Sequence, residues 1–400
     1  MNPKWANKRN RQGKESKKKQ KKKASDRKRR NRRKAMATET ASLAGIGRSS
    51  VNRTPIIRLH RRDKSLEELK MGNVMDEEDI NYFTKIDGRS SSVYVAVDKE
   101  SREIAFVARV NLYEDMTAQQ HDEYQRIFSY FARDRAIKGS QSLKNGAMRG
   151  GKMNAVGWRP GYEPGVHVDT YRRGKPRKGQ TTENDIREHV IGLTGVHDAI
   201  SNNFRSLSAL IHQNQNSQLR ELLVPAAGKH FGAQGDELDE SFCSNIAYTF
   251  DGFYNTVHCD RDASDFTYGM FGRTEKGSGK LMRKADCSFG DHTAGFSFAV
   301  IPYHIQVMLT QIDGVVELIW RGPRDGHCTT SGSTCTGCER MAFSCQIGKG
   351  LVRRVEMYGK QYDYELLSDE NRRRLHGHAT DVELDEENGN RSEGSEYLPY

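Results

Sequence analysis

The sequence predicts an α+β protein in which helices come first and a compact β sandwich or barrel follows, between two disordered tails. Three observations predict this class. Apolar and aromatic residues recur at helical spacing between residues 117 and 223. Short apolar runs separated by turn residues fill the segment 241–357. Both ends of the chain are rich in charge and poor in apolar residues, which is typical of disorder.

The two ends of the chain carry opposite charge. Residues 1–40 hold 18 Lys and Arg against 3 Asp and Glu, a net charge of +15, whereas the whole chain of 400 residues is +11, so the other 360 residues sum to −4. Because like charges repel and cannot form a core, we expect residues 1–75 to be a basic disordered tail and linker, and residues 366–400 to be an acidic disordered tail. The basic run is typical of a nuclear import signal, a nucleic-acid-binding arm or a solubilising segment.

The folded part is expected to be one domain over residues 76–365. Two β-branched runs at 91–97 and 104–110 flank a polar turn and predict a hairpin. Thr117 and Gln120 then form a capping-box pattern, which predicts the start of a helix. An apolar stripe follows at helical spacing and is expected to face the core. The stripe consists of Tyr124, Ile127, Phe128 and Phe131.

The centre of the chain is expected to contain loops, then helices, then the strands of the β core. A stretch rich in Gly, Lys and Arg from 138 to 180 predicts loops with a mobile basic segment. Residues 183–213 predict two helices with a break at Gly192 or Gly195. These helices would complete a helical support over 117–223. Six short strands then predict the β core, with the sequences NIAYTF, DFTYGMF, GFSFAVI, IQVMLT, VVELIW and MAFSCQI.

The location of the protein is constrained by what the sequence lacks. No apolar run is long enough to cross a bilayer, and the N-terminus has no apolar signal core, so we expect a cytosolic or nuclear protein with no membrane contact. The seven cysteines are then expected to be reduced thiols. Cys335 and Cys338 form a C-x-x-C pattern, which would require two further ligands to hold a structural zinc ion.

Two stretches have the form His-x-Asp, namely His167 with Asp169 and His258 with Asp260. Residues two apart on a strand lie on the same face, so either pair can bind one cation together. A His-x-Asp pair on the surface is also common without any metal. The second pair lies between two clearly predicted strands, whereas the first lies in the basic loop region.

A third ligand favours the second pair. His327 lies just beyond the strand VVELIW, and two histidines with one carboxylate form the facial triad of non-haem Fe(II) oxygenases, which leaves coordination positions open. Arg340 enters the following strand, and an arginine there can bind a carboxylate through its planar fork. A 2-oxoglutarate molecule needs both groups, because its keto acid chelates iron and its far carboxylate needs a fixed cation.

At these residues the sequence resembles a known family. The segments SNIAYTFDGFYNTVHCDRDASDFTYGMFG, ELIWRGPRDGHCTT and RMAFSCQ are similar to the Tet-like 2-oxoglutarate/Fe(II) oxygenases of the TET/JBP group, as is MNAVGWRPGYEPG upstream, and the fungal branch of the group is the most similar. The resemblance covers roughly residues 80–360. It implies a double-stranded β-helix core of the jelly-roll or cupin type with flanking helices.

The resemblance also implies roles for individual residues. His258, Asp260 and His327 would be the iron ligands and catalytic residues, and Arg340 would bind 2-oxoglutarate. Asn245, on the strand before His258, is a further cosubstrate candidate.

The base-contacting residues of the family cannot be transferred. Better-known animal members have a hydroxyl residue, an aromatic residue and a histidine where this chain has Ala342, Gln346 and Gly348. Asp262 and Asp265 lie just past the metal motif and can accept a hydrogen bond from an exocyclic amino group of a base. A solvated acidic loop is the alternative interpretation of these two residues.

The resemblance therefore implies a nuclear dioxygenase that uses Fe(II), 2-oxoglutarate and O2 to oxidise 5-methylcytosine in double-stranded DNA. The methylated base would be flipped out of the duplex to reach the iron. The competing hypotheses are a demethylase of N6-methyladenine or of methylated RNA with the same iron site, and an inactive methyl-DNA-binding protein. We expect a monomer.

Overall fold

The computed structural model describes most of the central part of the chain and neither end. It describes residues 56–60 and 70–361, except for 99, 140–141, 144–145, 162–167, 172–182, 232, 234, 288–294 and 334–336. The predicted disorder of the two tails falls largely outside the described residues, so the division into tails and domain stays a prediction. Strand β1 (Ile56–His60) is an exception, because it lies in the predicted linker yet pairs in parallel with β3 (Ser92–Val97).

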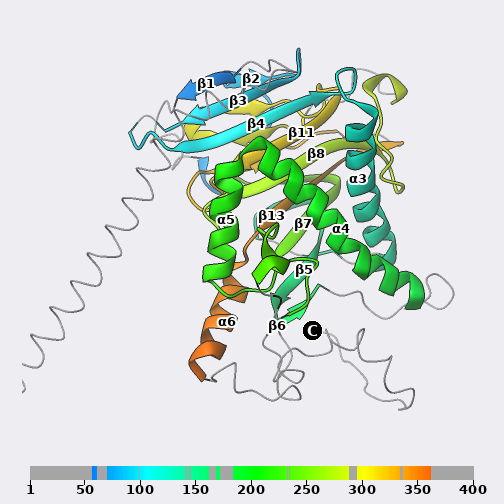
Figure 1. The fold of residues 1–400 in the computed structure, drawn as a ribbon. Coiled ribbons are helices and arrows are strands. Elements are labelled where there is room, and N and C mark those ends of the chain that lie inside the picture. The colour runs from blue at the N-terminus through cyan, green and yellow to red at the C-terminus, as the bar shows by residue number, and fades with distance from the viewer. Residues whose placement is uncertain are drawn as a thin grey trace, which may run out of the picture.

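The described strands form two sheets (Figure 1). The larger sheet has the order β1, β3, β4 (Ile104–Leu112), β11 (Gly314–Trp320), β8 (Thr267–Glu275), β13 (Cys338–Gln346), β7 (Asn245–Asn255), β5 (Met148–Pro160) and β6 (Val168–Thr170). The smaller sheet has the order β12 (His327–Thr329), β9 (Phe298–Val300), β10 (Ile305–Val307) and β2 (Thr84–Ile86). From β7 onward the chain passes back and forth between the two sheets, as in a double-stranded β-helix. The predicted fold class is confirmed.

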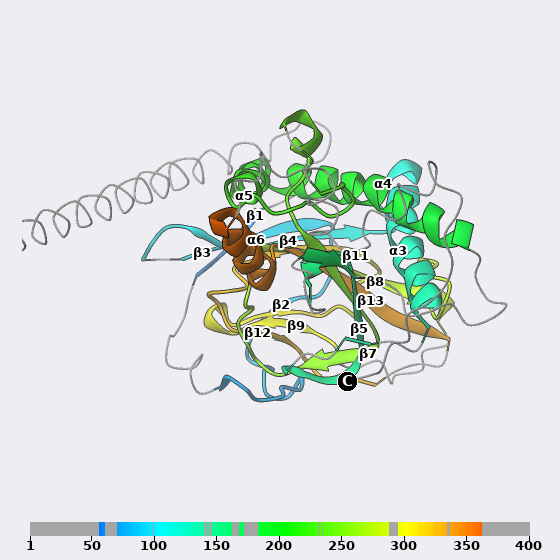
Figure 2. The ribbon, with the colours of Figure 1, turned by 90° about the horizontal axis from the view of Figure 1, so that it is seen from below.

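Helices cover the outer face of the larger sheet. Figure 2 shows α3 (Ala118–Lys138), α4 (Glu183–Leu207) and α5 (Ala209–Glu221) on one side of this sheet and the smaller sheet on the other. Helix α6 (Lys349–Gln361) follows β13 and contacts β5 and β6. Short 3-10 helices lie at Gly235–Leu238, Lys284–Asp286 and Ile301–Tyr303. None of the described helices has the length and apolar character needed to cross a membrane.

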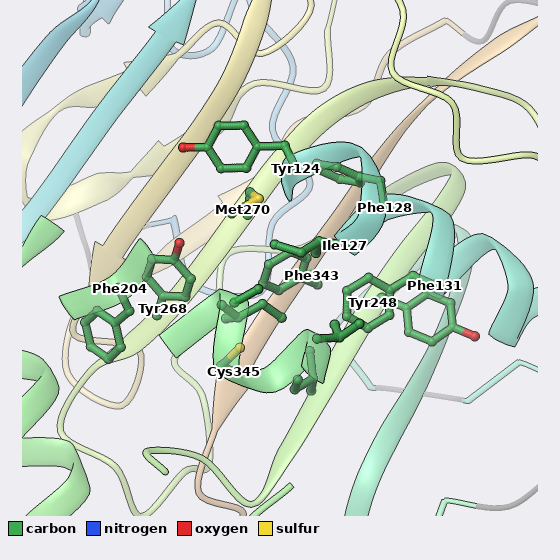
Figure 3. Packing of buried hydrophobic residues seen from close by; sticks show 14 of the residues in the cluster. Tyr124, Ile127, Phe128, Phe131, Phe204, Tyr248, Tyr268, Met270, Phe343 and Cys345 are labelled. Atoms are coloured by element: carbon green, nitrogen blue, oxygen red, sulfur yellow. The ribbon is translucent and has the colours of Figure 1, made fainter. Parts of the chain in front are cut away.

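Helix α3 forms as the sequence predicts. The Thr117 side chain accepts a hydrogen bond from the Gln120 N–H, and the Gln120 side chain accepts one from the Thr117 N–H, which completes the capping box. The predicted apolar stripe is buried and packs against strands β7, β8 and β13 (Figure 3). The ring of Phe131, for example, lies 5.1 Å from the rings of Tyr248 and Phe343. This core attaches helix α3 to the outer face of the larger sheet.

The predicted break between the next two helices is in the wrong place. Helix α4 continues through Gly192 and Gly195, and the break comes at Ser208, whose hydroxyl accepts a hydrogen bond from the Ile211 N–H and caps α5. A glycine inside a helix only lowers its stability by about 1 kcal/mol, whereas an N-cap serine satisfies a free backbone donor of a new helix. The cap is therefore the stronger signal.

The predicted loop over 138–180 is also wrong in part, because it contains the 13-residue strand β5. Its glycines allow close contact with β7. At Gly151 the φ angle is +70°, and a β-carbon there would lie 2.3 Å from the backbone of Phe253. Glycine lowers local strand propensity, so the pairing with β7, which local sequence does not reveal, stabilises this strand. Helix α6 was not predicted either, because residues up to 357 were expected to belong to the β core.

A second apolar core lies between the two sheets. It contains Phe271, Trp320 and Ala342 from the larger sheet and Phe298 and Val300 from the smaller. Side chains that point inward from either sheet therefore meet in one buried space. The predicted iron and cosubstrate residues lie on or beside these same strands.

Candidate active site

The two predicted histidines are brought together by their backbones. His258 follows β7 and His327 opens β12. Each backbone N–H donates to the carbonyl oxygen of the other residue over 3.0 Å, which forms an isolated antiparallel bridge. The two imidazole rings consequently lie with centroids 4.6 Å apart. The N–H of Asp260 donates to the Gly322 carbonyl over 2.9 Å, so the loop after β11 holds the third residue beside them.

Asp260 places one carboxylate oxygen against each histidine. Oδ1 is 3.4 Å from Nε2 of His258, and Oδ2 is 3.3 Å from Nε2 of His327. One ligand atom from each of the three side chains lies within 4.8 Å of the other two. Within the described part of the chain, no other three His, Cys, Asp or Glu side chains meet in this way. Cys338 is buried at the start of β13 and Cys335 lies outside the described residues, so the zinc hypothesis gains no support.

The hydrogen bonds of the two rings prepare them to bind a metal. Nδ1 of His258 lies 2.8 Å from the Thr256 carbonyl, and Nδ1 of His327 lies 3.0 Å from the Asp325 carbonyl. A carbonyl only accepts, so each Nδ1 must carry the hydrogen. In the neutral imidazole the lone pair is then on Nε2, which faces the carboxylate. Backbone partners of this kind are the usual support of histidine ligands.

The electrostatics of the cluster favour a bound cation. Burial alone would raise the pKa of Asp260, but the neighbouring His327 and His258 hold it well below its usual value. Burial would lower the pKa of His327, but the charge of Asp260 raises it. The carboxylate is therefore ionised and attracts positive charge. A divalent ion would replace the imidazole protons, because histidine binds metals in its neutral form. Two imidazoles and one carboxylate suit Fe(II).

Arg340 is a buried cation with unused hydrogen-bond donors. It is 9% exposed, and its Nη2 donates to the Phe253 carbonyl over 2.7 Å. Its Nε and Nη1 atoms are buried and have no hydrogen-bond partner in the described protein. Burial lowers its pKa to about 10, and Glu339 opposes this shift. An arginine buried in this way requires an anion, and a ligand carboxylate is the group that such a guanidinium binds best.

A series of aromatic contacts places Arg340 and the histidines in the same inner space. The guanidinium carbon of Arg340 lies 5.9 Å from the ring centre of Phe271 on β8. The Phe271 ring lies 5.6 Å from Phe298 on β9, which lies 5.8 Å from the His327 ring. The predicted anion-binding residue and the predicted metal ligands therefore face one interior between the two sheets.

The structure does not bring Asn245 to Arg340. Asn245 on β7 pairs with Gln346 on β13, six residues along the strand from Arg340. At about 3.3 Å per residue these positions are about 20 Å apart. Asn245 lies instead beside Gly348, where a β-carbon would be 3.6 Å from the side-chain oxygen of Asn245. The role of Asn245 as a cosubstrate residue stays a prediction, and the structure places it away from Arg340 because of the register between the paired strands, which neither local sequence reveals.

The two acidic residues after the motif differ in position. Asp262 forms a bridge with Gly348, and its Oδ2 atom is buried without a hydrogen-bond partner. Burial and the nearby charge of Asp260 raise the pKa of Asp262 well above its usual value. Asp265 is exposed, and its backbone N–H donates to the Gln218 side chain over 3.3 Å. Of the two predicted substrate residues, only Asp262 lies at the site.

Of the other His-x-Asp pair, only the aspartate is described, and it forms an ion pair away from the cluster. Asp169 lies on β6, where its Oδ2 is 2.5 Å from Nη2 of Arg159. This ion pair joins two neighbouring strands at the edge of the larger sheet. His167 lies outside the described residues.

Sequence reasoning missed the aromatic residues that line the interior, namely Phe271, Phe298 and Trp320. All three lie on strands that the sequence predicts. Alternation did not single them out, because both faces of these strands are buried and both carry apolar residues. The runs DFTYGMF, GFSFAVI and VVELIW contain the residues, but they do not show which face points inward.

The fold and the donor set define a class of protein, the 2-oxoglutarate- and Fe(II)-dependent dioxygenases. The comparison with protein families then gives the family: the chain belongs to the Tet-like 2OG-Fe(II) oxygenase superfamily, whose model matches residues 117–332. The match includes His258, Asp260 and His327 and ends before Arg340. The resemblance to this family is confirmed, and the fungal branch stays a prediction. The cofactors are accordingly Fe(II), 2-oxoglutarate and O2.

Two solved structures show a distant similarity to this chain. No curated protein matches the sequence. Among solved structures, NgTET1 in complex with 5mC DNA is 11% identical, with 75% of this chain and 95% of that chain covered and a TM-score of 0.38. A prolyl-4-hydroxylase from Pseudomonas putida is 10% identical, with 57% and 88% covered and a TM-score of 0.27. The assignment to the family rests on the family model.

Proposed function

We propose that this dioxygenase oxidises 5-methylcytosine in double-stranded DNA to 5-hydroxymethylcytosine and to more oxidised forms of the base. The observation that carries the proposal is the cluster of the half-buried His258 and Asp260 with the buried His327 in a chain of the Tet-like family. Two further groups support it. Among the described residues, Arg340 is a buried cation with no carboxylate hydrogen-bonded to it, and Asp262 is half-buried with one buried oxygen that has no partner.

The three clustered side chains would hold Fe(II) through two Nε2 atoms and the Asp260 carboxylate. Bound iron, together with 2-oxoglutarate and O2, supplies the oxidising power that places a hydroxyl on a methyl group and releases succinate and CO2. The chain's own contribution is to fix the ligands. The carbonyls of Thr256 and Asp325 hold the imidazole Nδ1 hydrogens, so both rings present Nε2 in one fixed orientation.

Arg340 would bind the far carboxylate of 2-oxoglutarate with the donors that the protein leaves unused. The apolar ring of Phe271 lies 5.9 Å from its guanidinium carbon, and such surroundings would strengthen the attraction between the guanidinium and a carboxylate. Arg340 would thereby hold the far end of the cosubstrate.

The position of the site between two sheets requires the base to leave the DNA stack. A methyl group in a stacked duplex cannot reach a buried metal, and enzymes that modify bases solve this by flipping the nucleotide. The free oxygen of Asp262 would accept a hydrogen bond from the exocyclic amino group of cytosine. The same oxygen would also accept one from adenine, so N6-methyladenine and methylated RNA are the competing substrates.

Contacts with DNA phosphates are assigned to the basic tail. Residues 1–40 have a net charge of +15 and the other residues sum to −4, so the positive charge that attracts a polyanion is concentrated in the tail. The same run supports a nuclear location. We extend the proposal to a monomeric enzyme in the nucleus.

The decisive experiment is a product analysis. The purified protein is incubated with Fe(II), ascorbate, 2-oxoglutarate and duplex DNA that contains either 5-methylcytosine or N6-methyladenine, and the nucleosides are analysed by mass spectrometry. Hydroxymethyl-, formyl- or carboxylcytosine would support the proposal. Loss of N6-methyladenine alone, or turnover of RNA alone, would favour the competing substrates. Binding of methylated DNA without any turnover would contradict the assignment of an active enzyme on these bases.

The ligand assignment is tested with single variants. His258→Ala, Asp260→Ala and His327→Ala should each abolish succinate formation and leave the far-UV circular dichroism unchanged. His121→Ala is a matched control, because His121 is a partly exposed histidine outside the cluster. If His167→Ala abolishes turnover and His258→Ala does not, the iron is bound by the other His-x-Asp pair.

A further inference from the structure

We infer that Gly322 is a positioning residue for the metal centre: it anchors the backbone of Asp260 and leaves the space that the Asp260 carboxylate occupies. This inference rests on the proposed iron ligands and adds a residue that neither the sequence motif nor the family resemblance assigns. Gly322 lies in the turn 321–326, which connects β11 to β12 and thereby leads into His327.

Two observations connect Gly322 to Asp260. The Gly322 carbonyl accepts the Asp260 N–H over 2.9 Å. A β-carbon at Gly322 would lie 2.5 Å from Oδ2 of Asp260 and 3.3 Å from its Cβ. Oδ2 is the oxygen that faces Nε2 of His327. Any side chain at position 322 would therefore press on the ligand atom between the aspartate and the second histidine.

A second side chain also limits the space at Gly322. The same β-carbon would lie 2.6 Å from Oγ1 of Thr267, at the start of β8. A side chain at position 322 would therefore meet the ligand oxygen and a buried hydroxyl at once. The backbone of Gly322 is outside the left-handed region, so alanine is compatible with its conformation. The glycine is required for space, and Gly322→Ala changes only that space.

The turn that contains Gly322 also holds the second histidine. The Asp325 carbonyl accepts the Nδ1 hydrogen of His327. Within the turn, Nε of Arg321 lies 2.6 Å from Oδ2 of Asp325 and Nη2 lies 3.0 Å from Oδ1, with both side chains 3% exposed. This bidentate ion pair fixes the turn. One rigid turn therefore positions two of the three proposed ligands, through the Gly322 and Asp325 carbonyls.

The inference predicts a specific loss of metal binding. Gly322→Ala should weaken the affinity for Co(II), used as a spectroscopic substitute for Fe(II), by about tenfold to a hundredfold, which is the usual effect of altering the residues that orient metal ligands. The d–d absorption of bound Co(II) should also shift, because the carboxylate oxygen is displaced. Gly195→Ala is the matched control, since no atom lies within 4 Å of a β-carbon there. An affinity of Gly322→Ala within twofold of the wild type would overturn the inference.

A double-mutant cycle on the metal-free protein tests the same contact independently of metal binding. Gly322→Ala should lower the midpoint of urea unfolding, and the loss should be smaller in the background of Asp260→Ala, which lacks the carboxylate. If Gly322→Ala does not fold alone, the same cycle is measured in the Thr267→Ala background, which removes the other side chain that a β-carbon would meet. An equal loss with and without the Asp260 carboxylate would contradict a role through Asp260.

Different results would refute the iron site and the role of Gly322. If Asp260→Ala binds Co(II) as tightly as the wild type, the proposed iron site itself is wrong. If Asp260→Ala loses Co(II) and Gly322→Ala retains both its affinity and its spectrum, the iron site stands and the role of Gly322 is refuted.

Discussion

Replacing Arg340 by methionine should remove cosubstrate binding without destabilising the protein. Most buried arginines are paired with a carboxylate, and removing such a partner costs several kcal/mol. Arg340 has one backbone acceptor, Phe253, and two unused donors. Its charge therefore destabilises the ligand-free fold and contributes favourably only when an anion binds. Methionine has a similar length and is apolar, so it fills the same space.

The magnitude follows from the pKa of Arg340, which burial lowers from 12.5 to about 10. At 1.36 kcal/mol for each tenfold change, burial disfavours the charged form by about 3 kcal/mol. The arginine is charged at neutral pH in both the folded and the unfolded state, so this cost is fully present and methionine removes it. The lost hydrogen bond to Phe253 costs about 1.5–3 kcal/mol in the opposite direction. The two effects largely cancel, and the free energy of unfolding without ligand should change by about 1.5 kcal/mol or less.

The effect on 2-oxoglutarate is much larger. A carboxylate that accepts two charge-assisted hydrogen bonds gains about 3 kcal/mol or more, which corresponds to a roughly hundredfold weaker affinity in the variant. The assay is urea unfolding and thermal unfolding of the Co(II)-loaded protein, with and without 2-oxoglutarate. The wild type should be stabilised by the cosubstrate and Arg340→Met should not, because only a bound ligand shifts the unfolding equilibrium.

A matched control is Arg273→Met. Arg273 lies directly opposite Arg340 on β8 and is buried to a similar degree. Its Nη2 donates to the Thr310 carbonyl over 2.6 Å, and its Nη1 lies 3.7 Å from Asp313. Arg273→Met should therefore lose stability and keep the response to 2-oxoglutarate. This prediction is refuted if the thermal unfolding midpoint of Arg340→Met lies several degrees below that of the wild type and 2-oxoglutarate still stabilises the variant fully.

Three further predictions concern the core, the pH dependence and the tail. Glu317→Gln should lower the free energy of urea unfolding by about 3–5 kcal/mol, because it leaves the largely buried charge of Arg109 without its partner. A loss below about 1 kcal/mol would contradict this prediction. Burial lowers the pKa of His212 to about 4, so the unfolded state binds its proton first as the pH falls. Stability should drop by up to about 3 kcal/mol between pH 6.5 and 4, and His212→Gln should flatten this drop in a pH series of unfolding curves. Deleting residues 1–40 should weaken binding to methylated and unmethylated duplexes equally and reduce the salt dependence of the affinity. An unchanged salt dependence would show that the tail does not contact the DNA phosphates.

The sequence predicted which side chains cluster as possible metal ligands better than it predicted the position of the candidate cosubstrate residues. His258 and Asp260 are two residues apart beside a strand, so their proximity is local and follows from strand geometry. His327 was identified by its place after a strand and by the known chemistry of a donor set. The relative position of the candidate cosubstrate residues depends instead on the register between two paired strands. Asn245 and Arg340 lie at opposite ends of paired strands, and nothing in the local sequence of either strand indicates this.

The missed elements have the same physical cause. Strand β5 contains glycines that lower its own strand propensity, and it forms because β7 offers a paired edge. The role of Gly322 is also non-local, since the atoms that exclude a side chain there come from Asp260 and Thr267. Capping and helical periodicity, in contrast, act within a few residues, which is why α3 could be predicted with its N-cap at Thr117.

The two opposite charges of the described site lie apart from each other. Asp260 is an ionised carboxylate and Arg340 is a cation, and they act on different parts of the interior. Burial and the charge of Asp260 raise the pKa of the neighbouring Asp262, which favours its neutral form. A ferrous dication next to Asp260 and the dianion of 2-oxoglutarate extending toward Arg340 would pair each of these charges locally and leave the total charge of the interior at zero. Because an uncompensated charge is costly between two apolar sheets, the metal should improve the binding of the cosubstrate, and the cosubstrate should improve that of the metal to the same degree.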